Sequence, residues 1–304
     1  AWSSANKLTL KSGNDIVIGA NITGAKGTLE LLPARTADPP YETALPRITG
    51  GATLAPDKTI RVDTLRLGVN ADSLPADYRP VDGLRTDPFL LDGKLRIGTL
   101  ELALDGGTLS ASADNPGNAI GAVRTTGNGS LGSLSVVDGD GDLRARLASN
   151  GDGVGVSLVT PGTLTLEAGS RLAFTTPSFV PTVTLASTGG NFVNQAGPTA
   201  FGSNVRFLVY SRSTAATVKG GLAGRDEFSR SFAGNPPGDY AGDTTSRFLF
   251  SQPGVAPELT YRADGKTRLY GDANPQLTYG VSGLREGDLL ASVVTGAPLL
   301  STTA

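Results

Sequence analysis

The 304-residue chain contains no cysteine, no methionine and no histidine. Without cysteine it can form no disulfide and no thiolate metal site, and it carries no thiol nucleophile. Without histidine it lacks the side chain that most often acts as a general base near neutral pH. Neutral drift in amino-acid composition explains these absences. Selection for export is the alternative, because a chain threaded unfolded through an outer-membrane pore must not form disulfides on the way.

Charge and long apolar runs are also scarce. Charged residues make up 18% of the chain, and the net charge is −2. A nearly neutral chain has no general attraction to nucleic acid or to an anionic membrane. No apolar run approaches the roughly 18 residues that would span a bilayer, so no membrane insertion is expected. The chain opens with neither methionine nor a signal-peptide pattern, which predicts a processed form or a piece of a longer protein.

What the sequence does contain is glycine and a recurring short motif. The 41 glycines often cluster with Asn and Asp, as in LDGGT and TGNGS, and supply the positive φ angles of sharp turns. Between the turns, two Leu or Val residues recur with one polar residue between them. These inward apolar pairs are Leu8/Leu10, Leu29/Leu31, Leu65/Leu67, Leu100/Leu102, Leu134/Val136, Leu164/Leu166 and Val183/Leu185.

The spacing of this motif favours an all-β solenoid. The first members of successive pairs are 21, 36, 35, 34, 30 and 19 residues apart. These intervals are close to one or two multiples of roughly 17–20 residues, the length of one solenoid coil. A β-sandwich or barrel is the alternative, but its hairpins would give a strand and turn every ~8–12 residues. We therefore predict stacked parallel coils over residues 1–190.

Two stretches interrupt the motif. Residues 33–47 and 70–89 are rich in Pro, Asp and Arg, and proline removes donors from a strand ladder. We expect loops or small hairpins extruded from the stack, on a face that solenoids often use for binding. Tyr41 and Tyr78 are candidates for stacking on sugars. The alternative is that they pin these loops to the solenoid.

Aromatic residues gather beyond the last motif. Ten of the seventeen Phe and Tyr residues lie between 192 and 261, and VRFLVYS (205–211) has the strongest strand pattern of the chain. The open end of a solenoid must be capped, because exposed core and unpaired backbone would aggregate. We expect residues 191–255 to form this cap, although an ordinary core would contain the same aromatics.

Residues 256–304 have the pattern of a small, incomplete β-domain. A turn cluster at 271–275 precedes a segment in which Leu277, Tyr279 and Val281 alternate with small residues, as in a half-buried strand. Little sequence follows, so we expect the chain to stop within this domain. Tyr270 and those three side chains are candidates for contact with another strand, because an isolated hairpin is marginally stable.

One acidic turn has part of a calcium-loop pattern. Asp138, Asp140 and Asp142 occupy positions 1, 3 and 5, but Leu143 stands where the loop needs Gly and Ser149 where it needs Glu. A solvated turn is the better interpretation, and a weak calcium site is the alternative. No other cofactor is expected.

Catalysis is not expected. Solenoids of this kind host polysaccharide lyases and glycosidases, whose chemistry needs two carboxylates at a fixed separation, or a basic residue with metal-binding acids. The Asp and Glu residues are scattered, with no acidic pair repeated on neighbouring coils.

Three segments resemble known proteins. The opening AWSSANKLTLKSGNDIVIGANITGAKGTLEL resembles filamentous-haemagglutinin-like exoproteins, and GGNFVNQAGPTAFGSNVRFLVYS with RFLFSQP resembles the segment that closes their helix. The tail KTRLYGDANPQLTYGVSGLREGD resembles the start of a YDG/MBG-type repeat, with one extra residue because Arg268 and Leu269 both precede Tyr270. The resemblance implies a right-handed parallel β-helix followed by a small β-domain.

The same resemblance implies a non-enzymatic adhesin that is secreted or held on the bacterial outer surface. Its partners would be a glycan or surface receptor and, during secretion, an outer-membrane transporter of the two-partner type. The alternative is a structural subunit that associates with itself into an extracellular filament, as in a biofilm, through strand exchange of the incomplete domain.

Overall fold

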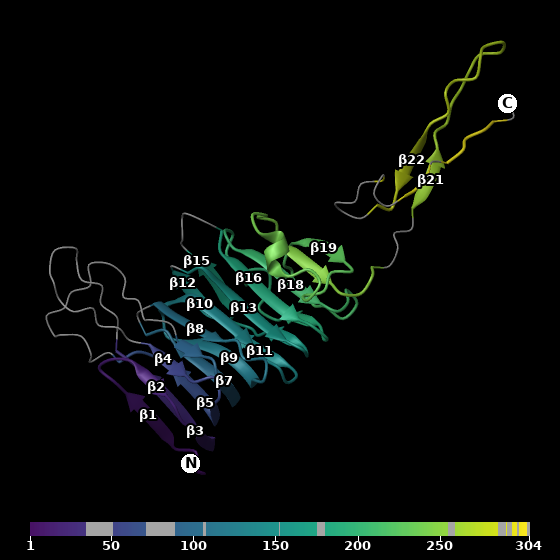
Figure 1. Ribbon diagram of the computed structural model, residues 1–304. Coiled ribbons are helices and arrows are strands. Elements are labelled where there is room, and N and C mark those ends of the chain that lie inside the picture. The colour runs from purple at the N-terminus through teal and green to yellow at the C-terminus, as the bar shows by residue number, and fades with distance from the viewer. Residues whose placement is uncertain are drawn as a thin grey trace. The chain divides into compact units, whose positions relative to one another are not determined.

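The computed structural model describes residues 1–34, 51–70, 89–105, 108–151, 153–174, 180–254, 259–284, 290, 294–296 and 298–302. Apart from one short 3-10 helix, η2 (Pro237–Tyr240), the named elements of this part of the chain are strands (Figure 1). The chain divides into two compact units, Ala1–Pro253 and Gly254–Ala304. The prediction of an all-β fold is confirmed.

Two large sheets build the first unit, and every strand pair in them is parallel. In spatial order, the eight-stranded sheet contains β1 (Lys7–Lys11), β3 (Ile22–Leu32), β5 (Thr59–Leu67), β7 (Lys94–Ala103), β9 (Ala119–Thr126), β11 (Leu143–Arg146), β14 (Leu164–Leu166) and β17 (Phe192–Asn194). The ten-stranded sheet contains β2 (Ile16–Ile18), β4 (Ala52–Leu54), β6 (Phe89–Leu91), β8 (Thr108–Ala113), β10 (Ser130–Val137), β13 (Gly155–Thr160), β16 (Thr182–Ser187), β18 (Arg206–Ser211), β20 (Arg247–Phe250) and β19 (Arg225–Phe228). A small parallel pair joins β12 (Ala148–Gly151) to β15 (Arg171–Phe174).

Up to β18 the chain alternates between the two large sheets, and we call each passage through both of them a coil. Parallel strands cannot be joined by a tight hairpin, so each one must be followed by a crossover. Here the crossover is the strand of the opposite sheet, as the ribbon shows (Figure 1). The sheets therefore grow together, one strand each per coil, and enclose one apolar cluster.

The leucine motif forms that core. Within the eight-stranded sheet, Leu29 pairs with Leu65 and Leu65 with Leu100, and all three are fully buried. The pairs Leu134/Val136 and Val183/Leu185 lie instead on strands of the ten-stranded sheet and face the same cluster. Leu8 is 40% exposed because β1 is an edge strand. The same motif thus serves both walls of the core.

The predicted coil length is wrong for the long intervals. Ladder neighbours one strand apart are separated by 21 residues (Thr9 and Glu30), 36 (Glu30 and Arg66), 35 (Arg66 and Glu101) and 23 (Glu101 and Arg124). An interval of 35 or 36 residues is therefore one coil and not two. The predicted insertions at 33–47 and 70–89 fall within these two intervals, and most of their residues lie outside the described part of the chain.

The last strands depart from simple alternation. β20 follows β19 in the chain but lies between β18 and β19 in the sheet. Phe207, Val209 and Phe248 face the main core. Leu208, Tyr210 and Leu249 face the opposite side, where Phe232 and Tyr240 pack over them. The segment 229–246 therefore covers the outer face of the ten-stranded sheet at this end.

The second unit contains an antiparallel pair, β21 (Thr260–Ala263) and β22 (Tyr279–Ser282). Tyr261 and Tyr279 are diagonal cross-strand neighbours, with ring centroids 5.6 Å apart. Along β22, Tyr279 and Val281 are half-buried while Gly280 and Ser282 are exposed. This alternation follows from the period of two in a strand.

Candidate functional site

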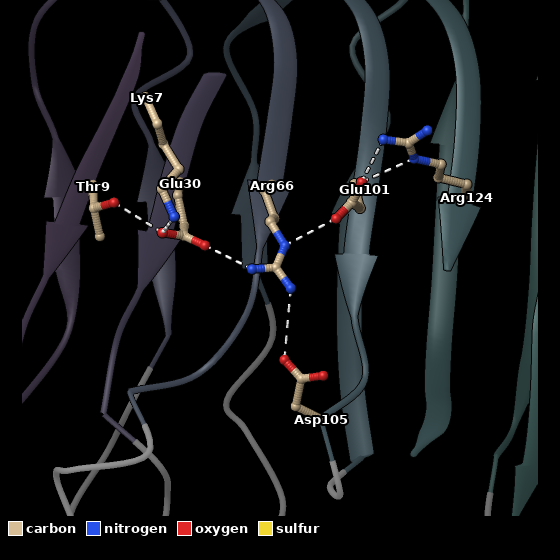
Figure 2. Close-up of polar contacts among 7 residues, drawn as sticks. All are labelled: Lys7, Thr9, Glu30, Arg66, Glu101, Asp105 and Arg124. Atoms are coloured by element: carbon tan, nitrogen blue, oxygen red, sulfur yellow. Dashed lines mark hydrogen bonds and ion pairs between the residues drawn. The ribbon is translucent and has the colours of Figure 1, made fainter. Parts of the chain in front are cut away.

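A row of charged side chains crosses the outer face of the eight-stranded sheet (Figure 2). Glu30, Arg66 and Glu101 occupy paired positions on β3, β5 and β7, and Arg124 follows on β9. Arg66 donates to Glu30 at 2.6 Å through Nη1 and to Glu101 at 2.9 Å through Nε. Arg124 Nε donates to Glu101 Oε2 at 2.8 Å. The signs alternate from strand to strand, so each acid lies between cations.

Glu30 is the most strongly held member of this row. It is 3% exposed, and its Oε2 accepts hydrogen bonds from Lys7 Nζ and Thr9 Oγ1, both at 2.8 Å. Burial raises the pKa of Glu30, but hydrogen bonds from Lys7, Thr9 and Arg66 outweigh it and lower the pKa to about 2. A carboxylate ionised at all ordinary pH values cannot donate a proton near neutrality. The row is therefore suited to joining coils, not to acid catalysis.

The three aspartates of the calcium-like turn have different surroundings. Asp138 is 2% exposed, and its Oδ1 accepts the backbone N–H of Ile120 at 2.9 Å while its Oδ2 accepts the Thr160 hydroxyl at 3.0 Å. Burial raises the pKa of Asp138, against the lowering effect of these hydrogen bonds. Asp138 thus links three neighbouring coils, because Ile120 and Thr160 lie on β9 and β13.

The other two members of the turn are exposed. Asp142 Oδ1 accepts the backbone N–H of Thr163 at 2.7 Å, and Asp140 is solvent-facing. Among the described residues, no group of three or more acids lies in a metal-binding arrangement. The geometry of Asp138 is that of a structural hydrogen-bond acceptor between coils.

Near the last strands of the first unit, a polar pair lies beside aromatic rings of the core. Lys219 Nζ lies 2.6 and 2.8 Å from the carboxylate oxygens of Asp226, and 4.6 Å from the ring centroid of Phe248. Phe248 contacts Phe207 at 5.2 Å between centroids, and Phe207 contacts Phe201 at 5.3 Å. These three aromatics belong to the main core cluster.

Four arginines gather on the outer face of the same end, among β18, β19 and β20. Arg247 pairs in register with Arg225, and Arg206 lies one row away on β18. Arg247 binds Glu227 and Asp243 through its two Nη atoms. Arg225 and Arg230 lie 3.9 and 3.6 Å from Glu227 oxygens and are half exposed. Sequence reasoning missed this cluster, because its members come from three strands and one covering segment.

The predicted interaction residues of the second unit lie in different settings. Tyr270 is fully exposed, next to Leu269, which is 77% exposed. Leu277 lines a groove of about 300 Å³ together with Lys266, Arg268 and Leu300. Tyr279 and Val281 lie on one face of β22, as described above. The structure therefore does not gather the four into one site. Tyr41 and Tyr78 lie outside the described residues.

Comparison with known proteins bears on the second unit. Residues 259–304 match the family model of the MBG domain, YGX type. This match confirms the part of the resemblance that concerned a YDG/MBG-type repeat. No curated protein and no solved structure matches the chain. In the part of the chain that the structure describes, no helix is long and apolar enough to cross a membrane.

Proposed function

We propose that the chain is a non-enzymatic segment of a bacterial haemagglutinin-like adhesin, secreted or displayed on the outer cell surface. In this proposal the first unit is a right-handed parallel β-helix, and its ligand is a glycan or surface receptor. An outer-membrane transporter would pass the chain during secretion. One observation carries the proposal: a stack of parallel coils is followed directly by a segment that matches an MBG domain.

The chemistry of the first unit supports a binding role over a catalytic one. The charged row on the eight-stranded sheet consists of mutually neutralised ion pairs, and the pKa of Glu30 in it is lowered to about 2. Solenoids offer long, repetitive outer surfaces, which suit recognition of extended partners. The low overall charge argues against nucleic acid as that partner.

The test is a binding assay with the labelled full chain on an array of immobilised glycans, and on bacterial and host-cell surfaces. We expect saturable binding that unlabelled protein competes away. The same glycans, incubated in solution with the protein, should release no reducing or unsaturated ends. Absence of binding to every surface, or turnover of any glycan, would refute the proposal.

A filament subunit is the second candidate, favoured by the two-stranded pair of the second unit. β21 and β22 pair only with each other among the described residues. A two-stranded ribbon with free edges readily accepts another strand. If strand exchange builds filaments, electron microscopy of the full chain should show fibres without ligand, and deletion of residues 259–304 should leave soluble, folded monomers.

A further inference from the structure

One buried cation in the arginine cluster has unused hydrogen-bond donors. Arg206 is 6% exposed, and its Nε and Nη2 atoms have no hydrogen-bond partner. No ion pair within the described residues involves Arg206, whereas Arg225, Arg230 and Arg247 each contact Glu227. Guanidinium stays protonated in proteins and offers five donors but no acceptor. Buried guanidinium donors without acceptors are costly, because they have lost their hydrogen bonds to water and have formed none within the described residues.

The neighbouring acids are already occupied. Asp243 accepts the backbone N–H of Thr245 at 2.7 Å through Oδ1, and Oδ2 binds Arg247 Nη2. Glu227 serves the other three arginines through both of its oxygens. Both carboxylates are therefore engaged by other groups. Besides the hydrogen bonds from Thr245, the charge of Arg206 helps to lower the pKa of Asp243, but no hydrogen bond between the two is formed.

The arginines also repel one another. Burial lowers the pKa of Arg247, and the nearby charges of Arg225 and Arg206 lower it further. The Nε atom of Arg247 is buried without a partner as well. Neighbouring parallel strands lie about 4.8 Å apart, so side chains at paired positions on β20 and β19 are in contact range. Three guanidiniums thus lie near one another, and Arg206 and Arg247 carry buried donors without a partner.

We propose that Arg206, Arg225 and Arg247 form a binding site for an oxyanion, which is either a carboxylate or a sulfate group. The oxygens of a carboxylate or sulfate can each accept a hydrogen bond from the N–H donors of a planar guanidinium. A chloride ion cannot bind two donors in this way, so these oxyanions are favoured over chloride. The half-exposed Arg225 and Arg230 would make first contact with the anion. The covering segment would then admit it to Arg206, since η2 contributes no buried residue. If the chain is the proposed adhesin, this site makes acidic saccharides its ligand class, an extension that rests on the proposed function.

The test is isothermal titration of the full chain with sodium sulfate and with sodium acetate, in a chloride buffer of constant ionic strength. Wild-type protein should bind saturably. Arg206→Gln should weaken binding at least about tenfold, and Arg225→Gln measurably. The matched control is Arg96→Gln, an exposed arginine on β7 of the other sheet, which should bind as wild type does.

A second measurement separates an anion site from a merely structural arginine. In chloride alone, Arg206→Gln should be at least as stable as wild type, because it removes a buried cation with unsatisfied donors. Sulfate should raise the Tm of wild type and of Arg96→Gln more than that of Arg206→Gln. If Arg206→Gln does not fold, the decision rests on Arg225→Gln. Weaker anion binding by Arg225→Gln would support the site, and unchanged binding would show that Arg206 is only structural. No saturable binding by wild type, or equal binding by all variants, would overturn the site.

Sodium glucuronate and glucose then test the saccharide extension. Glucuronate should compete with sulfate, and glucose should not. If the salts bind but no glycan surface does, the anion site stands and the proposed function fails. If glycan surfaces bind Arg206→Gln and Arg225→Gln with the same affinity as wild type, the proposed function stands. In that case the arginine site does not bind the glycan.

Discussion

Glu30 and Arg66 face each other across β3 and β5, with Oε1 and Nη1 2.6 Å apart, although 36 residues separate them in the chain. The contact exists because each coil returns the chain to the same row of the sheet. Arg66 also reaches Glu101, and Glu30 also holds Lys7. Together with Arg124 on β9, this row of side chains joins five neighbouring strands of the sheet.

Neutralising Glu30 should destabilise the first unit at neutral pH but not in acid. Its pKa is lowered from 4.5 to about 2 in the folded chain, so its stabilisation is complete above pH 4.5 and is lost as the pH falls toward 2. Glu30→Gln should lower the free energy of unfolding by roughly 2–3 kcal/mol at pH 7, and by little at pH 2. Urea denaturation at several pH values measures this.

Glu167→Gln is the control for that series, because Glu167 is 35% exposed and its contact with Arg144 is long, at 3.8 Å. It should change stability by less than about 1 kcal/mol at any pH. Equal pH profiles for the two variants would contradict the account of Glu30.

Truncating one inward leucine should be severe. Leu100 is fully buried between Leu65 and Val123 in the ladder, so Leu100→Ala should cost about 2–5 kcal/mol through a cavity. Leu90→Ala on β6, where the side chain is 40% exposed, is the matched control and should cost far less. Chemical denaturation measures the free energy of unfolding of both variants. Similar losses of stability in the two would argue against a shared core.

Asp138 should matter for stability and not for calcium. Asp138→Ala leaves the backbone N–H of Ile120 without its acceptor, which should cost about 1–3 kcal/mol. Asp140→Ala, in the same turn but exposed, should cost little. Thermal melting with and without micromolar calcium should show no calcium dependence for the wild type. A rise in Tm with calcium that disappears in Asp140→Ala would revive the metal-site interpretation.

The single tryptophan reports on the first coil. Trp2 Nε1 donates to the carbonyl of Asn6 at 3.1 Å, and a Cβ on Gly27 would lie 2.1 Å from that nitrogen. Gly27→Ala should therefore displace the indole into water and shift its fluorescence emission to longer wavelength. Gly13→Ala, where a Cβ would meet nothing within 4 Å, should leave the spectrum unchanged. Identical spectra for the two variants would show that Trp2 does not occupy this place.

Much of the fold could be predicted from local pattern. Residues two apart in a strand share a face, so each Leu-x-Leu pair predicts a buried face wherever the strand lies. Leu65, Leu67, Leu100 and Leu102 confirm this. The pattern could not show which sheet a strand joins, because both walls of the core need the same alternation. Nor could it show that an interval of 36 residues is one coil, because an excursion of any length can return to the same register.

The sequence by itself determined the all-β character, the core-facing leucines and the MBG-like tail, because each depends on residues adjacent in the chain. Only the tertiary structure decided which charges meet. Parallel pairing places residues of successive coils side by side in one row, although the length of chain between them varies from coil to coil. That register places Glu30 between two cations. At the last coils, the insertion of β20 between β18 and β19 brings the arginines together. Within the described residues it leaves Nε and Nη2 of Arg206 without a hydrogen-bond partner.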